Sequence, residues 1–253
     1  MPKKLKYLLL IIPATIIVVF FMKRNSSDTV QVTKGSIIEA VYGIGTVTPT
    51  HNYQLKLGIT ATLSKLYVRE GDFVKTGEAL VDLDSGTHFV APFSGTITSL
   101  PYKIGESIFP QAPILTLTDL TDRYVVVSLE QQGALRVRKG QKVKLSFESL
   151  RGQKLTGVVR SLFPNNGEFF AHIDVDQLPA EILPGMTADV AIEVGHKENV
   201  LLVPVAAISS GQISVKRGGF KKIPVQLGVV DGMMAEVTSG DLQENDWVVV
   251  KGK

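Results

Sequence analysis

Short runs of alternating apolar and polar residues dominate the chain beyond position 28. In the segments 142–147 (KVKLSF) and 187–194 (TADVAIEV), apolar side chains recur at every second position, which is the period of a half-buried strand. Glycine, asparagine and proline separate such runs. The one good helical pattern is brief, covering 129–138 and ending before Lys139 and Gly140. The pattern therefore predicts a mainly β protein of barrels or sandwiches.

An apolar run near the N-terminus predicts a membrane helix. Residues 7–22 carry no charge, three lysines precede them, and Lys23 and Arg24 follow. Sixteen helical residues reach roughly 24 Å, and flanking lysines that snorkel extend this reach across the bilayer core. The alternative is a cleaved signal peptide, although two cations stand where its cleavage site is expected. The residues expected to form an uncleaved anchor are Tyr7, Leu8, Leu9, Leu10, Ile11, Ile12, Ile16, Ile17, Val18, Val19, Phe20, Phe21 and Met22.

An internal repeat with a constant offset of 34 positions organises the middle of the chain. Residues 61–84 can be laid over residues 95–118, which pairs Gly71 with Gly105 and matches apolar positions along both copies. Each copy reads as strand, glycine–acidic turn, strand, and the two glycines supply the positive φ that such turns need. We expect residues 51–84 and 87–120 to interlock as two halves around one core.

The net charge of +3 belongs to the N-terminus. Five of the 27 Lys and Arg residues lie in the first 24 positions with no acidic residue, so the other 22 face 24 Asp and Glu. A nucleic-acid partner is therefore not expected. The segment 216–222 (KRGGFKK) predicts a basic hairpin tip that is exposed to solvent. Near a membrane, such a tip also suits anionic headgroups or a transporter.

No catalytic or metal-ligating arrangement is visible, and we expect neither enzyme activity nor a cofactor. The chain has no cysteine, and its four histidines show neither H-x-H nor H-E-x-x-H spacing. Asp82 and Asp84 are spaced as a carboxylate pair, but no base or nucleophile accompanies them, and we interpret them as a solvated strand end. The larger aromatic residues are expected to pack in the core or between strands; they are Tyr67, Phe73, Phe93, Phe109 and Trp247.

The repeat resembles the two halves of the biotinyl/lipoyl fold, the barrel-sandwich hybrid. Residues 68–80 read VREGDFVKTGEAL and residues 91–97 read APFSGTI, as the first and second halves of that fold do. A lipoyl carrier presents a modifiable lysine on the turn between the halves, whereas the turn at 84–88 (DSGTH) has none. A zinc peptidase of related fold needs a histidine pair that this chain lacks. The adaptor proteins remain.

Segments beyond the repeat are similar, in the same order, to those of periplasmic adaptors, the HlyD-like membrane fusion proteins. Residues 125–143 resemble the entry to the family's β-barrel, 183–190 (LPGMTADV) its "L-x-P-G-M-x-x-x-V", and 200–208 (VLLVPVAAI) its return to a membrane-proximal domain. The resemblance covers nearly all of residues 28–253. It implies four parts: 1–27 as anchor and linker, 28–50 with 198–253 as membrane-proximal domain, 51–120 as lipoyl-like domain and 121–197 as β-barrel domain.

The sequence departs from the family between the two lipoyl halves. Most adaptors insert a long α-helical hairpin there, and its tip engages an outer-membrane channel. Here five residues fill the gap, and no heptads exist in the chain. The chain is either a natural adaptor without a hairpin or a shortened one. The candidates for a channel-contact tip are Ser85, Gly86, Thr87 and His88; the alternative is a plain turn that touches nothing.

Gln111 is a candidate channel-lining residue. Residues 111–119 (QAPILTLTD) are similar to the lipoyl segment of adaptors that serve ABC-type exporters of macrolides or lipids. In that subgroup a glutamine at this position projects into the central channel and forms a ring. The alternative is an ordinary loop glutamine that faces solvent.

The resemblance implies an adaptor of a multi-component efflux or export transporter. Such a protein links an inner-membrane permease, of ABC or RND type, to an outer-membrane channel, and forms a homo-oligomeric ring, six copies by family analogy. Flanking charge favours a cytoplasmic N-terminus, which leaves the bulk of the chain in the periplasm. The alternative is an anchored envelope scaffold or binding module with the adaptor fold and no transporter partner.

Overall fold

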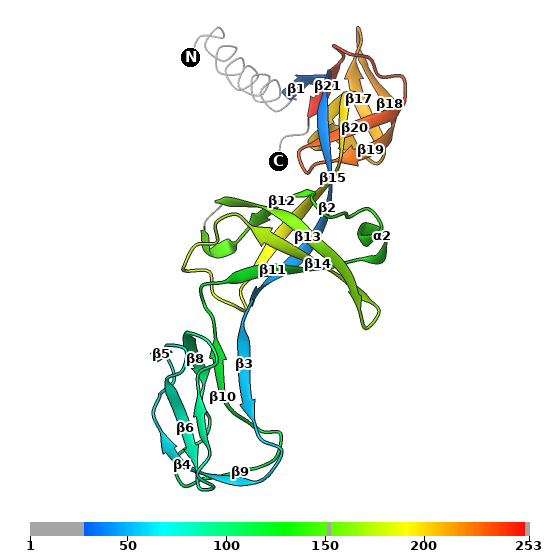
Figure 1. Cartoon of the computed structure of the whole chain (residues 1–253). Helices are drawn as coiled ribbons and strands as arrows, with labels where there is room; N and C mark the ends of the chain where they lie inside the picture. The colour runs from blue at the N-terminus through cyan, green and yellow to red at the C-terminus, as the bar shows by residue number, and fades with distance from the viewer. Residues whose placement is uncertain (1–27, 151–152, 251–253) are drawn as a thin grey trace, which may run out of the picture. The chain divides into compact units, whose positions relative to one another are not determined.

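The computed structural model describes residues 28–150 and 153–250, and nearly all regular structure in them is β (Figure 1). The described residues form two compact units, one from residues 28–40 and 195–250, the other from residues 41–194. This confirms the predicted mainly β class. The predicted anchor residues lie outside the described residues. Within residues 28–150 and 153–250, no helix is both long and apolar enough to cross a membrane.

Residues 52–118, the lipoyl-like segment, form two four-stranded sheets. The strand order is β3-β10-β8-β5 in one sheet and β7-β6-β4-β9 in the other. Each strand of the first half has an equivalent in the second half: β3 corresponds to β7, β4 to β8, β5 to β9 and β6 to β10. Replacing every strand by its equivalent converts the first order into the second, and each sheet takes two strands from each half. The interlocking predicted from the repeat is thereby confirmed. The strands are β3 (Asn52–Lys56), β4 (Ala61–Leu66), β5 (Phe73–Val74), β6 (Ala79–Leu83), β7 (His88–Val90), β8 (Gly95–Ser99), β9 (Ser107–Ile108) and β10 (Pro113–Thr118).

Reciprocal backbone hydrogen bonds join the two halves. The Gly71 N–H donates to the Ile97 carbonyl at 2.8 Å, and the Gly105 N–H donates to the Leu63 carbonyl at 2.8 Å. Both glycines have the positive φ that the sequence predicts, +89° and +87°. The halves share one apolar core, in which Leu63, its repeat mate Ile97 and twelve further residues are buried. Residues from both halves contribute to this core, so the two halves bury it together.

A closed six-stranded barrel follows the lipoyl-like segment. Its order is β12-β13-β14-β11-β2-β15, and β12 also pairs with β15, so these six strands close on themselves. Val125, Val127, Ile173 and Val190 are among the fully buried core residues. The elements are β2 (Thr33–Pro49), β11 (Arg123–Leu129), α2 (Gln131–Ala134), β12 (Lys142–Ser146), η1 (Glu148–Leu150), β13 (Lys154–Asn165), β14 (Glu168–Val175) and β15 (Thr187–Pro204).

The terminal unit, residues 28–40 and 195–250, contains a sheet of its own. Its order is β1-β21-β17-β16, with β18 paired to the other side of β17, and β19 and β20 continue from β15. Val203, Ile213, Val215 and Val248 are fully buried in its core. The elements are β1 (Asp28–Gln31), η2 (Val205–Ala207), β16 (Ile208–Ser209), β17 (Gln212–Lys216), β18 (Phe220–Pro224), β19 (Gln226–Val230), β20 (Met234–Ser239) and β21 (Trp247–Val250).

The brief helix predicted at 129–138 is present but shorter: α2 covers Gln131–Ala134, and the chain after Leu135 continues as turns. The expectation that the larger aromatic residues pack in the core or between strands is wrong for most of them. Of the aromatic residues predicted to be buried, Phe93 alone packs against a core. The others are exposed because they stand on the outward positions of strands or in connecting segments; they are Tyr67, Phe73, Phe109 and Trp247.

Candidate functional site

The turn between the two lipoyl halves is tightly bonded to itself and to β4. The Leu83 N–H donates to the Thr87 carbonyl, and the Gly86 N–H donates to the Leu83 carbonyl, both at 3.0 Å. Gly86 has φ +79°, which an L side chain rarely adopts. Asp84 donates its N–H to the Thr62 carbonyl at 3.0 Å and accepts the Thr62 N–H on its carboxylate at 3.2 Å. The turn is therefore a fixed, exposed loop.

Asp82, which precedes this turn on β6, is the centre of a hydrogen-bonded cluster with Tyr67 and His88 that the sequence analysis did not predict. Its side chain accepts the Tyr67 hydroxyl at 2.7 Å and lies 2.6 Å from Nδ1 of His88. Because an ionised carboxylate only accepts hydrogen bonds, Nδ1 of His88 carries the proton. The hydrogen bond from Tyr67, and after it the one from His88, hold the pKa of Asp82 below its usual value. The hydrogen bond between Tyr67 and Asp82 also raises the pKa of Tyr67.

The interpretation of Asp82 as part of a solvated strand end is therefore wrong. Asp82 is only 6% exposed, and its carboxylate is bonded by Tyr67 and His88. Asp84 does stand at the exposed end of the strand, and its bonds to the backbone of Thr62 lower its pKa. No local sequence signal marked the cluster, because β6 is buried at four consecutive positions, 80–83, Asp82 among them. A tyrosine fifteen positions earlier was not recognisable as a partner.

Gln111 occupies a strained backbone position. It has φ +66° and donates its N–H to the Leu57 carbonyl at 2.7 Å. The residue at the equivalent position of the first half is Gly77, which has φ +86° and donates to the Ala91 carbonyl at 2.8 Å. The repeat thus requires a left-handed conformation at this turn, and only the second half places a side chain there.

Gln111 and the turn 84–88 lie at the same end of the lipoyl-like segment. Thr62, which bonds Asp84, is paired with Ser107 of β9, and Gln111 follows β9 by three residues. Strand β3 runs from the chain's entry beside His51 toward this end. At the entry, the Asp119 N–H donates to the His51 carbonyl at 3.0 Å. The two predicted sites therefore share the end opposite the chain's entry and exit.

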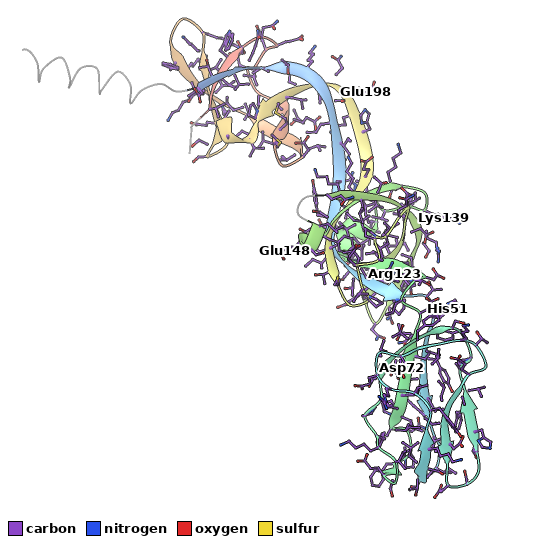
Figure 2. All side chains as sticks on the ribbon, turned by 90° about the vertical axis from the view of Figure 1, so that its left-hand side faces the viewer. His51, Asp72, Arg123, Lys139, Glu148 and Glu198 are labelled. Atoms are coloured by element: carbon purple, nitrogen blue, oxygen red, sulfur yellow. The ribbon has the colours of Figure 1, made fainter. Side chains whose placement is uncertain are left out.

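The LPGM motif at 183–186 has a structural role. Gly185, with φ +90°, donates to the Val47 carbonyl at 2.9 Å, and the Val47 N–H donates to the Met186 carbonyl at 2.9 Å. Arg123, labelled in Figure 2, begins β11 and donates to the carbonyls of Leu178 at 3.2 Å and of Ile182. These contacts fasten the segment before β15 onto β2 and complete the barrel.

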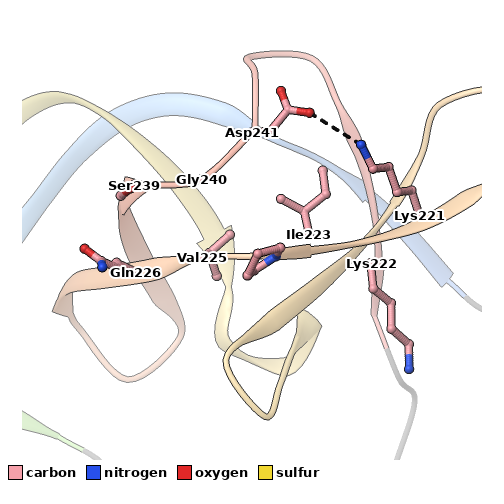
Figure 3. Close-up of a pocket in the computed structure, with 9 residues that line it drawn as sticks. Lys221, Lys222, Ile223, Val225, Gln226, Ser239, Gly240 and Asp241 are labelled. Atoms are coloured by element: carbon pink, nitrogen blue, oxygen red, sulfur yellow. Dashed lines mark ion pairs between the residues drawn. The ribbon is translucent and has the colours of Figure 1, made fainter.

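The segment 216–222 forms the expected basic hairpin between β17 and β18. Arg217 is held by two carboxylates: its Nε donates to Asp246 at 2.8 Å and its Nη1 to Asp241 at 3.1 Å. The Arg217 guanidinium keeps the pKa of Asp246 below its usual value. Figure 3 shows Lys221 turned toward Asp241, at 3.9 Å, over a shallow pocket between β18 and the segment 239–241, while Lys222 points away from it.

Comparison with curated proteins finds export proteins. The chain is 26% identical over 182 residues to the macrolide export protein MacA of Yersinia pestis, covering 66% of this chain and 49% of that protein. It is 21% identical to the pyoverdine export membrane fusion protein PvdR of Pseudomonas aeruginosa, covering 88% of this chain and 89% of that protein. The chain thus spans about half the length of the MacA relatives that it matches. No family model matches it.

Solved structures share the fold of this chain. MacA of Actinobacillus actinomycetemcomitans superposes with a TM-score of 0.66 at 18% identity, over 88% of this chain and 99% of that one. ZneB of Cupriavidus metallidurans superposes with a TM-score of 0.58 at 16% identity, over 90% and 93%. The chain therefore has the same β fold as MacA and ZneB. One of the sequence relatives is named a membrane fusion protein, so the chain is similar to such proteins in sequence as well as in fold.

Proposed function

We propose that the chain is the adaptor subunit of an export or efflux transporter, which links an inner-membrane permease to an outer-membrane channel by forming an oligomeric ring. The observation that carries this proposal is the pair of interlocked lipoyl halves next to a closed barrel, shared with MacA over 88% of the chain. The relatives named for macrolide export and pyoverdine export support transport of small molecules. The substrate is then chosen by the permease.

The domain arrangement that we propose follows the adaptor pattern. Residues 1–27 form the cytoplasmic tip, inner-membrane anchor and linker, and the bulk of the chain lies in the periplasm. Residues 28–50 with 198–253 form the membrane-proximal domain, 51–120 the lipoyl-like domain and 121–197 the barrel domain. The apolar run 7–22 between cations supports the anchor. The permease is of the ABC or RND type.

Several copies form a ring in this proposal, with Gln111 at its lumen. The support for Gln111 is its backbone: a glutamine held at φ +66° by the bond to Leu57 has a fixed direction of projection. A side chain that leaves the backbone in the same direction in every subunit suits a constriction. Six subunits are expected by family analogy. The outer-membrane channel, if one is engaged, meets the turn 84–88.

An anchored envelope scaffold without a transporter is the second candidate. The observation that favours it is the shortness of the connection between β6 and β7, only residues 84–87, where most adaptors carry the hairpin that reaches a channel. The turn also offers no aromatic or arginine side chain of the kind that anchors protein interfaces.

Co-purification distinguishes the two functions. The full chain, tagged at its C-terminus, is extracted from native membranes in mild detergent, and the proteins that remain bound are identified by mass spectrometry. The adaptor function predicts a stoichiometric permease and a ring-sized assembly. Recovery of the chain without any permease, while the membranes retain full export activity, contradicts it. A matched purification of the variant Gln111→Gly shows whether that residue affects assembly.

A further inference from the structure

Two aromatic residues and a lysine stand in one row across the sheet of the terminal unit. Trp247 on β21 is paired with Lys216 on β17, and Lys216 is paired with Phe220 on β18. Residues directly opposite each other in antiparallel strands point to the same face. Phe220 is 71% exposed and Trp247 is 46% exposed. The row is therefore an amphipathic surface feature that takes no part in the core.

The charge on this face is not neutralised within the described residues. Lys222 is two positions from Phe220, and alternate residues of a strand share a face. In the described part of the chain, neither Lys216 nor Lys222 has a carboxylate within ion-pair distance, whereas Arg217 is paired with Asp241 and Asp246. Figure 3 shows Lys222 directed away from Asp241. The exposed face is thus both aromatic and net positive.

The opposite face of the same strands makes the core of the unit. Val215 and Val248, the neighbours of Lys216 and Trp247, are fully buried, and Ile223 is 2% exposed. Folding of the unit is therefore satisfied by one face of the sheet. Exposure of the Phe220 and Trp247 rings to water is unfavourable, and the fold does not require it. These exposed rings therefore indicate a partner for this face.

The chain before β1 indicates what that partner is. Strand β1, the neighbour of β21, begins at Asp28, and the uncharged run 7–22 ends six positions earlier. Six residues span at most about 20 Å when fully extended. If the run 7–22 is the anchor of the proposed function, this sheet is tethered within reach of the bilayer surface.

We propose that the face formed by Trp247, Lys216, Phe220 and Lys222, the aromatic–basic row, binds an anionic phospholipid surface. Tryptophan is enriched at the membrane–water interface because its ring is apolar and its N–H is polar, and an exposed phenylalanine inserts among the upper acyl chains. Lysines beside them attract anionic headgroups. The proposal rests on the anchor in the proposed function and adds a second, reversible contact that orients the unit on the membrane.

Trp247 makes the test direct, because it is the only tryptophan in the chain. The full chain is reconstituted into vesicles of phosphatidylcholine, alone or mixed with phosphatidylglycerol, and the lipids carry bromine on their acyl chains. Flotation of the vesicles reports whether the chain is anchored. Quenching and a blue shift of the Trp247 emission report whether the row touches lipid. We expect strong quenching with phosphatidylglycerol, weak quenching without it, and a decrease when salt is added.

The variant Lys216→Gln/Lys222→Gln should weaken docking of the face by about fivefold for each lysine, and Phe220→Ser should reduce the blue shift. The control Lys142→Gln/Lys154→Gln removes two exposed barrel lysines and should leave quenching unchanged.

If the chain floats but Trp247 is unquenched in both lipids, the row proposal is overturned while the anchor stands. If the chain does not float, the anchor and the row fail together. Quenching that changes only when a permease is added would identify a protein partner and overturn the lipid assignment.

Discussion

The backbone N–H of Gln111 donates to the carbonyl of Leu57 at 2.7 Å, and this bond reproduces the one from Gly77 to Ala91 in the other half of the repeat. The two turns have φ values of +66° and +86°. The conformation at Gln111 is therefore imposed by the repeated architecture, although the residue itself disfavours it. Any function of the glutamine side chain is separable from the fold, since glycine performs the structural part at the sister position.

Substitutions at the two positions should differ in their effect on stability. Gly77→Ala is expected to cost about 1–2 kcal/mol, because a Cβ at φ +86° is strained although it meets no atom within 4 Å. Gln111→Gly relieves the same strain while increasing the freedom of the unfolded chain, and should change stability by less than about 1 kcal/mol. Urea denaturation of both variants measures this. A large loss of stability in Gln111→Gly would show that its side chain supports the fold.

Loss of export in Gln111→Gly at unchanged stability would support the channel-lining role. The matched control is Gln153→Gly, which removes an exposed barrel glutamine. Equal export by Gln111→Gly and wild type would contradict that role.

The sequence predicted the fold well where glycines and apolar residues repeat, and poorly where single polar residues meet across the fold. Gly71 and Gly105 at a spacing of 34 were sufficient to predict two interlocked halves. Gln111 was not recognised as a left-handed position because it is not a glycine. Asp82 was interpreted as solvated because its partners, Tyr67 and His88, reach it through β pairing that local patterns do not encode. Trp247 lies outside the core for a similar reason, because the face on which a strand residue stands depends on strand register and not on residue type.

The Asp82 cluster should make stability depend on pH below neutrality. The pKa of Asp82 is depressed in the folded protein by the bonds from Tyr67 and His88. Its contribution is therefore complete above the unfolded value of about 3.9 and is lost as pH falls through the lower folded pKa. Thermal unfolding of the wild type between neutral and acidic pH should show this loss. Asp82→Asn should lower the Tm near neutral pH and flatten the curve.

Tyr67→Phe provides the control, because it removes the largest cause of the depressed pKa and keeps the carboxylate. Its pH dependence should be weaker than that of the wild type and stronger than that of Asp82→Asn. Three superimposable curves would mean that the cluster does not contribute to stability.

The buried Glu236 should depend on Lys197. Glu236 is 6% exposed and accepts from Nζ of Lys197 at 2.8 Å and from the Val229 N–H at 2.9 Å. These bonds, with that from Lys197 the strongest, lower its pKa. Lys197→Gln leaves the carboxylate buried without its cation, and we expect a loss of about 1–3 kcal/mol near neutral pH. Lys222→Gln, which breaks no ion pair among the described residues, should stay within about 0.5 kcal/mol.

The pH dependence of the same variants tests the cause. Stability from Glu236 is present above its unfolded pKa and is lost as pH falls through the depressed folded value. In Lys197→Gln the folded pKa rises, so the loss should begin at a higher pH than in the wild type. Chemical denaturation at several pH values measures the difference between the two proteins. An unchanged onset of the loss would indicate that Lys197 does not set the protonation of Glu236.

The last prediction concerns the turn where most adaptors carry their hairpin. If an outer-membrane channel is engaged, Ser85 and Thr87 are the side chains that reach it, because the bonds of Leu83, Asp84 and Gly86 hold the turn outward in one conformation. Each tip offers little area, so binding would come from repetition around a ring of subunits rather than from one buried contact.

Because the chain has no cysteine, Ser85→Cys and Thr87→Cys introduce unique crosslinking sites. Crosslinks from both to a channel protein in whole cells are the expected result. Glu168→Cys, exposed on the β13–β14 hairpin of the barrel, is the matched control and should give none. Crosslinks from Glu168→Cys alone, or export that continues without any crosslink from the turn, would exclude the tip contact and favour docking through another surface.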